Sequence, residues 1–400
     1  MQLMQPDTAN PPGVYLDHAA TTPLDPGVAE AFSRALRLPR ANPSSRHAPG
    51  AAARRLVEEA REEAALLIGA SPEEVYFTSG GTESDALGVI GLARAAARER
   101  GARHVVLSAV EHSAVREAAA ALDAEGFEIT RLGVDRHGLV DPDELAAALR
   151  QDTALAAVMW ANNEVGTVQP VGGLAGVCRE RGVPLHCDAV QAVGHLPVDV
   201  SGTPVSTLAF TGHKLYGPSG VGALYVRGGS EVTYIEPLLR GGGQERGLRG
   251  GTENVAGIAA FGEACRLARA ELEERARRER VLRGRLVEGV TAIPGVRLNG
   301  HPERRLPGNA HLSVEGADAE SVVMICDALG YAIGNGAACS SADQKASTVL
   351  LAMGLSEAEA FSSVRVSVGK DNTPEEIDGF LEAFSGAVAR LREMSPLYAG

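Results

Sequence analysis

The residues with the clearest chemistry are a lysine and an aspartate, each placed next to an apolar run. Lys214 lies in the segment TGHKLYGP, residues 211–218, among small and hydroxyl residues, and Asp188 ends the run that leads into HCDAVQ, residues 186–191. A lysine in this setting can hold an aldehyde cofactor as a Schiff base, and a carboxylate can keep a pyridine nitrogen protonated. The pair therefore predicts a site for pyridoxal phosphate (PLP), at strand ends where open α/β sheets bind their ligands.

A glycine-containing junction, TSGGTES at residues 78–84, joins an expected strand to an expected helix. Glycines let the backbone approach an anion, and a helix N-terminus offers free N–H groups and a favourable dipole. Gly81 and Thr82 are therefore candidates for binding a phosphate. The alternative is an ordinary helix cap, because serine and threonine are common at that position.

Three polar side chains near expected strands have both a functional and a structural interpretation. His112 can stack on a flat cofactor and move protons, or it can cap a helix. Asn163, in NNEVG at residues 162–166, can bind a carboxylate or a cofactor hydroxyl, or form a turn. Arg365 can anchor a carboxylate through two hydrogen bonds, or it can be an exposed strand residue. The residues alone leave these alternatives open.

Cys339 differs from the other four cysteines in its surroundings. Cys187, Cys265 and Cys326 lie in apolar or helical segments typical of buried cysteines, and Cys178 gives no stronger signal. Cys339 lies in GNGAACSSAD, residues 334–343, among small and polar residues without periodicity. This pattern predicts an accessible loop and a candidate nucleophile.

A second loop is expected at residues 241–252, GGGQERGLRGGT, which is too rich in glycine for the interior of a helix or strand. It carries two arginines and Thr252. It is either a mobile surface loop or an anion-binding loop that reaches into a neighbouring subunit.

Strand-like runs alternate with helix-like runs through most of the chain. Expected strands cover residues 74–77, 104–108, 127–132, 154–160, 183–187, 207–210 and 222–226, with helices such as 82–100, 114–124 and 142–149 between them. This alternation predicts an α/β fold with a mainly parallel sheet. A long helix follows at about 254–290, and its Glu- and Arg-rich middle, 271–285, predicts a solvated face. The remainder predicts a smaller α+β unit with a last helix at 374–392.

The length of 400 residues exceeds one ordinary core. We expect a large domain over residues 14–262 and a small C-terminal domain over 263–400 that also includes residues 1–13. A net charge of −13 argues against direct nucleic-acid binding, and no apolar run reaches membrane-spanning length. Five cysteines without a signal peptide predict reduced thiols and a cytoplasmic location.

Taken in order, these segments resemble the cysteine desulfurases of the class V aminotransferase family. The matching stretches cover nearly the whole chain: YLDHAATTP (15–23), NPSSRH (42–47), FTSGGTES (77–84), EH (111–112), NNEVGT (162–167), Asp188 with Gln191, residues 211–218 and the loop 241–254. The resemblance implies a PLP-dependent transferase of fold type I. Its large domain would hold a mainly parallel seven-stranded sheet, beside a smaller α+β domain.

The resemblance also implies a role for each matching residue. The phosphate would be held by a set of small, hydroxyl and imidazole residues: Gly81, Thr82, Thr211, His213 and, from the partner subunit of a homodimer, Thr252. The remaining cofactor contacts would come from Lys214 as the Schiff-base lysine, Asp188 at the pyridine nitrogen, Gln191 at the ring hydroxyl and His112 stacked on the ring. The substrate carboxylate would bind Asn163 and Arg365. We expect Lys214, His112 and Cys339 to be catalytic and no residue to bind a metal.

The implied activity converts L-cysteine to L-alanine and leaves a persulfide on Cys339. The sulfur would pass to an iron–sulfur scaffold or another acceptor protein, such as a tRNA-thiolation relay. Two alternatives remain: a selenocysteine lyase or other PLP-dependent lyase, and an inactive paralogue that only binds sulfur-transfer partners. Around Cys339 the chain departs from the family pattern, with NGAA (335–338) before it and Lys345 and Ala346 after it.

Overall fold

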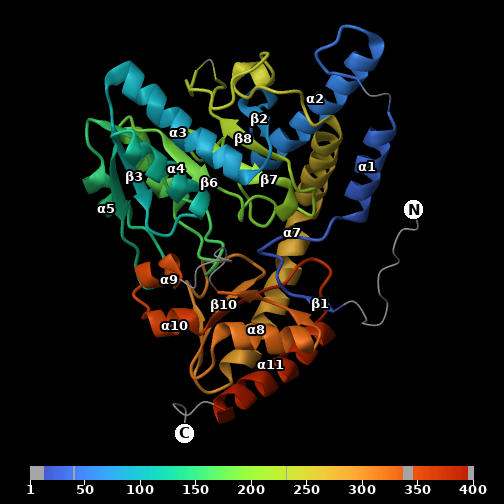
Figure 1. The fold of residues 1–400 in the computed structure, drawn as a ribbon, viewed down its shortest axis with the longest axis vertical. Coiled ribbons are helices and arrows are strands. Elements are labelled where there is room, and N and C mark those ends of the chain that lie inside the picture. The colour runs from blue at the N-terminus through green and yellow to red at the C-terminus, as the bar shows by residue number, and fades with distance from the viewer. Residues whose placement is uncertain (1–12, 39–40, 231, 337–345, 395–400) are drawn as a thin grey trace.

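The computed structural model describes residues 13–38, 41–230, 232–336 and 346–394 of the chain. Its centre is a seven-stranded sheet in which β8 runs antiparallel to both neighbours while the other strands are parallel to one another (Figure 1). The strands lie in the order β2 (Val75–Thr78), β8 (Gly222–Val226), β7 (Thr207–Thr211), β6 (Leu185–Asp188), β5 (Thr153–Ala157), β3 (His104–Ser108) and β4 (Glu128–Leu132). The predicted mainly parallel sheet is confirmed.

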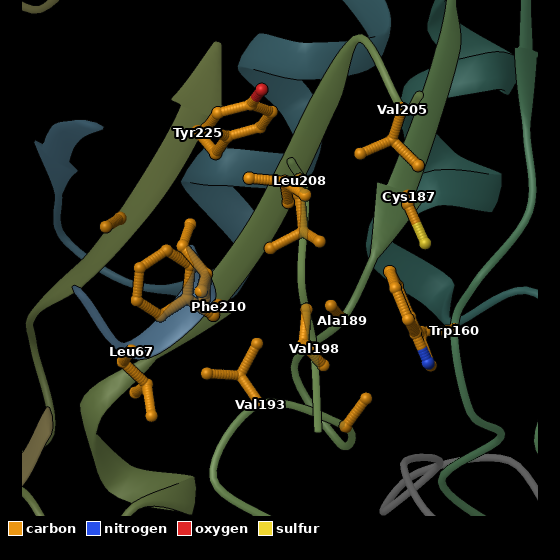
Figure 2. Close-up of a cluster of buried hydrophobic side chains, with 14 of the residues drawn as sticks. Leu67, Trp160, Cys187, Ala189, Val193, Val198, Val205, Leu208, Phe210 and Tyr225 are labelled. Atoms are coloured by element: carbon orange, nitrogen blue, oxygen red, sulfur yellow. The ribbon is translucent and has the colours of Figure 1, made fainter. Parts of the chain in front are cut away.

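Both faces of this sheet are covered, so its inner strands are buried along their whole length. Successive side chains of a strand point to opposite faces. Accordingly, Val105 and Leu107 pack in one core and Val106 packs in the other. Figure 2 shows part of the second core, where Leu208, Phe210 and other side chains of the sheet meet. Burial on both faces explains why these strands read as continuous apolar runs.

Helices of the first 250 residues pack around the sheet and against one another. They are α1 (Pro26–Arg37), α2 (Ala48–Ile68), α3 (Gly81–Arg100), α4 (Ser113–Ala124), α5 (Pro142–Ala148) and α6 (Val171–Glu180). Helix α3 contacts β5, β6, β7 and β8. It approaches β6 closely at Gly88, where an added Cβ would lie 2.3 Å from Nδ1 of His186. Glycine at this position therefore sets the distance between α3 and the sheet.

The long helix α7 (Val255–Thr291) joins the central sheet to a second unit. Its first turns place Phe261 and Ala264 in a core of the large sheet, and its last turns place Leu286 and Val290 in the core of the second unit. The boundary at residues 262 and 263 stays a prediction.

The second unit contains a four-stranded antiparallel sheet with the order β12 (Gly334–Asn335), β13 (Ser363–Ser367), β10 (Asn309–Val314) and β9 (Val296–Asn299). Its helices are α8 (Ala319–Ala328), α9 (Thr348–Ala352), α10 (Glu357–Phe361) and α11 (Pro374–Met394). The N-terminal strand β1 (Val14–Tyr15) belongs here, because it pairs in parallel with β11 (Tyr331–Ala332). The expected smaller α+β unit is confirmed.

One expectation about α7 is wrong in part. The charged stretch 271–285 was expected to form a solvated face, but Arg275 and Glu279 are 4% and 1% exposed. The guanidinium of Arg275 lies over the ring of Tyr216, 4.8 Å from its centroid. The alternation of Glu and Arg hid these two buried positions.

Within the described residues, no helix is long and apolar enough to cross a bilayer.

Candidate active site

A cavity of about 670 Å³ lies where the carboxyl ends of β6 and β7 face the second unit. The large sheet and its helices contribute most of its wall, and the second unit contributes Gly334, Asn335 and Arg365. The cavity brings together most of the residues predicted from the sequence: Gly81, Thr82, His112, Asn163, Asp188, Gln191, Thr211, His213, Lys214 and Arg365.

Lys214 lies on a short 3₁₀ turn, Gly212–Lys214, directly after β7. Its side chain is only 9% exposed, and Nζ donates hydrogen bonds to the carbonyl oxygens of Ala19 and Ala20, at 2.6 Å each. The two carbonyls hold the amine inside the cavity. An amine held there is well placed to condense with an aldehyde.

Asp188 ends β6 and points its carboxyl group into the same cavity. Its Oδ1 accepts a hydrogen bond of 2.9 Å from the backbone N–H of Val190. Burial raises the pKa of Asp188, and the nearby His112 and Lys214 oppose that rise. A protonated pyridine nitrogen would supply the positive partner that a buried carboxylate requires, so this residue fits PLP.

His112 lies beside Asp188 and caps α4, because its Nδ1 accepts a hydrogen bond of 3.2 Å from the N–H of Ala114. Burial lowers the pKa of His112, which favours a neutral ring at neutral pH. The capping alternative and the cavity position are therefore both correct. A neutral, flat ring in this position suits stacking on a cofactor.

The N-terminus of α3 provides the expected anion site. Gly80 precedes the helix, and among the described residues no side chain caps its first N–H groups. An added Cβ at Gly81 would lie 2.8 Å from Cγ2 of Val190, so only glycine fits without displacement of that side chain. Uncapped N–H groups at a helix N-terminus bind phosphate readily. The donor set therefore fits the phosphate of PLP.

His213 and Gln191 also line the cavity. Burial, reinforced by Lys214, lowers the pKa of His213 to about 4, so its ring is neutral at neutral pH and can donate one hydrogen bond. Nε2 of Gln191 donates to the carbonyl of Ala19 at 2.9 Å. The side chain of Gln191 is thereby fixed against the segment that also holds Lys214.

Arg365 and Asn163 both line the cavity and contact each other. Nη1 of Arg365 donates to the carbonyl of Asn163 at 2.9 Å, and Nη2 donates to Oδ1 of Asp17 at 2.8 Å. Arg365 is 2% exposed, so the alternative of an exposed strand arginine is wrong. Its Nε has no hydrogen-bond partner among the described residues. A carboxylate ligand would satisfy this buried donor.

Two predicted residues are not among the described residues that line this cavity. Thr252 is exposed at a separate cavity of about 170 Å³, beside Ser79, Glu245 and Arg249. Cys339 lies outside the described residues. The other four cysteines are buried, as expected.

Asp85 is a cavity residue that the sequence reasoning missed. Its Oδ1 lies 3.2 Å from Nε2 of His186. A carboxylate oxygen of Asp85, a carboxylate oxygen of Asp188 and a ring nitrogen of His112 all lie within 4.8 Å of one another. Burial raises the pKa of Asp85, and the charge of Asp188 adds to the rise. The spacing of Thr82 and Asp85, three residues apart on one helix face, was the available signal.

The sequence matches the class V aminotransferase family over residues 14–380. The cysteine desulfurase IscS of Methanosarcina thermophila is 44% identical over 384 residues, which cover 96% of this chain and 94% of that protein. The chain belongs to the cysteine desulfurases of the class V aminotransferase family. Proteins of this family depend on PLP, so the predicted cofactor and fold type are confirmed.

Solved structures are similar over the same length. A NifS-like protein superposes with a TM-score of 0.87 at 34% identity, covering 94% of this chain and 100% of that one. SspA in complex with cysteine superposes with a TM-score of 0.79 at 33% identity, covering 90% of this chain and 100% of SspA. The residue roles inside the cavity stay predictions.

Proposed function

We propose that this cysteine desulfurase removes sulfur from L-cysteine, releases L-alanine and retains the sulfur as a persulfide on Cys339. The observation that supports this most directly is the shared cavity of Lys214 and Arg365. The cavity holds an amine that can condense with an aldehyde and a guanidinium that can anchor a carboxylate, the two groups that a PLP enzyme needs for an α-amino acid substrate. The presence of both, with Asp188, argues against an inactive paralogue.

The residues at the cofactor end would hold PLP and control one proton. PLP, when bound, withdraws electrons from the Cα atom of an amino acid attached to it. With PLP bound, Asp188 would keep the pyridine nitrogen protonated, and the N-terminus of α3 would hold the phosphate. Lys214 is the amine in the cavity that can take a proton from Cα and return one.

At the substrate end, Arg365 and Asn163 orient the amino acid by its carboxylate. Gly334 and Asn335 line the cavity, and Asn335 precedes Cys339 by four residues in the sequence. The Cys339 thiolate forms a bond to the substrate sulfur while the Cβ–S bond breaks. The electron pair of that bond stays with the carbon skeleton, which leaves as alanine after protonation.

The proposal extends to assembly and sulfur delivery. In a homodimer, Thr252 would contribute to the phosphate site of the partner subunit, which agrees with its position outside the cavity of its own chain. Exposed Leu36 and Leu38 line a surface cavity together with Asn254, and the second copy would cover them. The acceptor would be an iron–sulfur scaffold or another sulfur-accepting protein in the cytoplasm.

The test is a brief pulse of L-cysteine followed by peptide mass spectrometry and an alanine assay. We expect one extra sulfur atom on the peptide that contains Cys339, and alanine in the supernatant. Cys339→Ser should bind PLP and L-cysteine but form neither product, whereas Cys326→Ser serves as a control at a buried cysteine. Turnover of selenocysteine alone, or sulfur on another cysteine with Cys339 unmodified, would contradict the proposal.

A further inference from the structure

Both ends of the segment that carries Cys339 attach beside residues of the substrate end of the cavity. At its near end, Gly334 pairs with Arg365 in the sheet, and Gly336 donates its N–H to the carbonyl of Ser363 at 2.9 Å. An added Cβ at Gly336 would lie 2.5 Å from that carbonyl oxygen. Glycine at position 336 therefore lets the chain that continues from β12 pass close to the backbone of β13, two residues from Arg365.

At the far end, the chain returns to the fold at Ser347, eight residues after Cys339. Ser347 caps α9, and its Oγ accepts a hydrogen bond of 3.2 Å from the N–H of Leu350. The same Oγ donates a hydrogen bond to Oε2 of Glu164. Ser347 and Glu164 are 5% and 7% exposed, so little water competes for this contact.

Two further contacts hold the start of α9 in place. Nη1 of Arg116 donates to Oγ1 of Thr348 at 2.8 Å. Val349 and Leu350 pack in a small core with Val165. The return point is therefore fixed to the turn that follows β5 and to helix α4.

Glu164 belongs to the same turn as Asn163, and its backbone is held firmly. Oδ1 of Asn162 accepts hydrogen bonds from the N–H groups of Glu164 and Val165, at 2.9 Å each. Nδ2 of Asn309 donates to the carbonyl of Glu164 at 3.1 Å. Because these bonds hold the backbone of Glu164, its hydrogen bond to Ser347 fixes Ser347 relative to this turn.

Burial and the neighbouring polar groups have opposite effects on the pKa of Glu164. Burial raises its pKa to about 7, and the hydroxyl of Ser347 together with Arg365 and Arg116 opposes that rise. Either protonation state keeps an oxygen available to Ser347. The contact is therefore a hydrogen bond whose existence does not require an ionised carboxylate.

We propose that Glu164 is a positioning residue for sulfur transfer, which fixes through Ser347 the point where the chain returns from Cys339, beside the turn that carries Asn163. This inference rests on the proposed function, because it assumes that Cys339 accepts the sulfur. Glu164 acts on the geometry of the acceptor and not on the cofactor. Its loss should therefore slow persulfide formation and leave proton exchange at the substrate Cα unchanged.

The test compares two rates in the PLP-loaded enzyme: exchange of the cysteine Cα proton with D₂O, and persulfide formation on Cys339 after rapid mixing with L-cysteine. Glu164→Ala and Ser347→Ala should each lower the persulfide rate about tenfold or more, since misplacement of a reacting group by about 1 Å can cost 10²-fold. Glu164→Gln retains an acceptor oxygen and should stay within about threefold of the unaltered enzyme.

Ser356→Ala is the matched control. Ser356 caps the neighbouring five-residue helix α10, where its Oγ accepts from the N–H of Glu359 at 3.3 Å and donates to Oε2 of Glu359 at 2.8 Å. The Ser356→Ala variant therefore loses the same kind of cap, but at α10, which does not directly follow the segment that carries Cys339. Ser356→Ala should leave both rates unchanged.

The outcomes separate this inference from the proposed function. Absence of a Cys339 persulfide in the unaltered enzyme would overturn the proposed function and this inference with it. A normal Cys339 persulfide in the unaltered enzyme, with no slowing in Glu164→Ala or Ser347→Ala, would overturn this inference alone. Equal slowing of proton exchange and persulfide formation would also overturn it, because Glu164 would then act on substrate binding.

Discussion

Replacing Glu245 with glutamine should destabilise the protein strongly although the two side chains have nearly the same size. Oε2 and Oε1 of Glu245 lie 2.7 and 2.9 Å from Nη1 and Nη2 of Arg61, and Oε2 also accepts the N–H of Phe77 at 2.8 Å. The side chains of Arg61 and Glu245 are 5% and 3% exposed. The glutamine would leave the Arg61 guanidinium buried beside a neutral amide.

The magnitude follows from the partners that Arg61 would retain. Removing one member of a buried ion pair costs about 3–5 kcal/mol. Arg61 keeps the carbonyl of Val75 at 2.8 Å and the 53%-exposed Glu58 at 3.2 Å. These partners place the expected loss at the lower end, about 3 kcal/mol.

The assay is urea unfolding at pH 7 and constant protein concentration, because association would couple to stability. Glu263→Gln is the control, since it breaks an exposed pair with Arg266 that should contribute at most about 1 kcal/mol. The double variant Arg61→Met with Glu245→Gln should lose less stability than the sum of the two single variants. A loss in Glu245→Gln no larger than in Glu263→Gln would refute the reasoning.

Three other predictions concern the cavity and its surroundings. A heterodimer of one Lys214→Ala subunit and one Thr252→Ala subunit should regain part of its activity, since one of its two sites carries neither lesion; no recovery would place Thr252 in its own chain's site. Asp188→Ala should keep part of its bound PLP, measured after denaturation, but lose most alanine production, and normal turnover would reject its role. Burial raises the pKa of Glu111 to about 8, from an ordinary value of 4.5. The native state therefore binds more protons than the unfolded state between these values, and stability falls as pH rises from 5 to 8, by up to about 1.4 kcal/mol per pH unit. Glu111→Gln should flatten this dependence in urea titrations at pH 5 and pH 8, and an unchanged slope would contradict the assigned burial effect.

The sequence was sufficient for features that depend on local pattern. Apolar runs that end in Asp188 or precede Lys214 predicted strands whose ends share one cavity, because parallel strands bring their carboxyl ends to the same edge of the sheet. Arg365 was harder, since an alternating strand does not reveal which face is covered. Its burial comes from a packing of two units that no local pattern encodes.

Other features depend on distant contacts and were missed for that reason. Arg275 lies in a Glu- and Arg-rich stretch typical of a solvated helix, yet it packs on Tyr216, which follows β7 of the seven-stranded sheet. Asp85 is buried because α3 crosses the sheet closely enough to reach His186. The position of Thr252 relative to the phosphate depends on a second copy of the chain.

The pairing of β1 with β11 has a consequence for the order in which a ribosome makes this protein. Leu16 packs in the core of the second unit, and the N–H of Ala19 donates to Oγ of Ser367 at 2.9 Å. The carbonyl of Ala19 is one of the two that hold the Lys214 amine. Residues 16–19 therefore cannot take their final positions until residue 367 has been synthesised, although large chains generally begin to fold from their N-terminal part during synthesis. Until translation passes residue 367, the lysine is synthesised but the backbone that steadies it is not yet in place, so a truncated or stalled chain should not form a competent cofactor pocket.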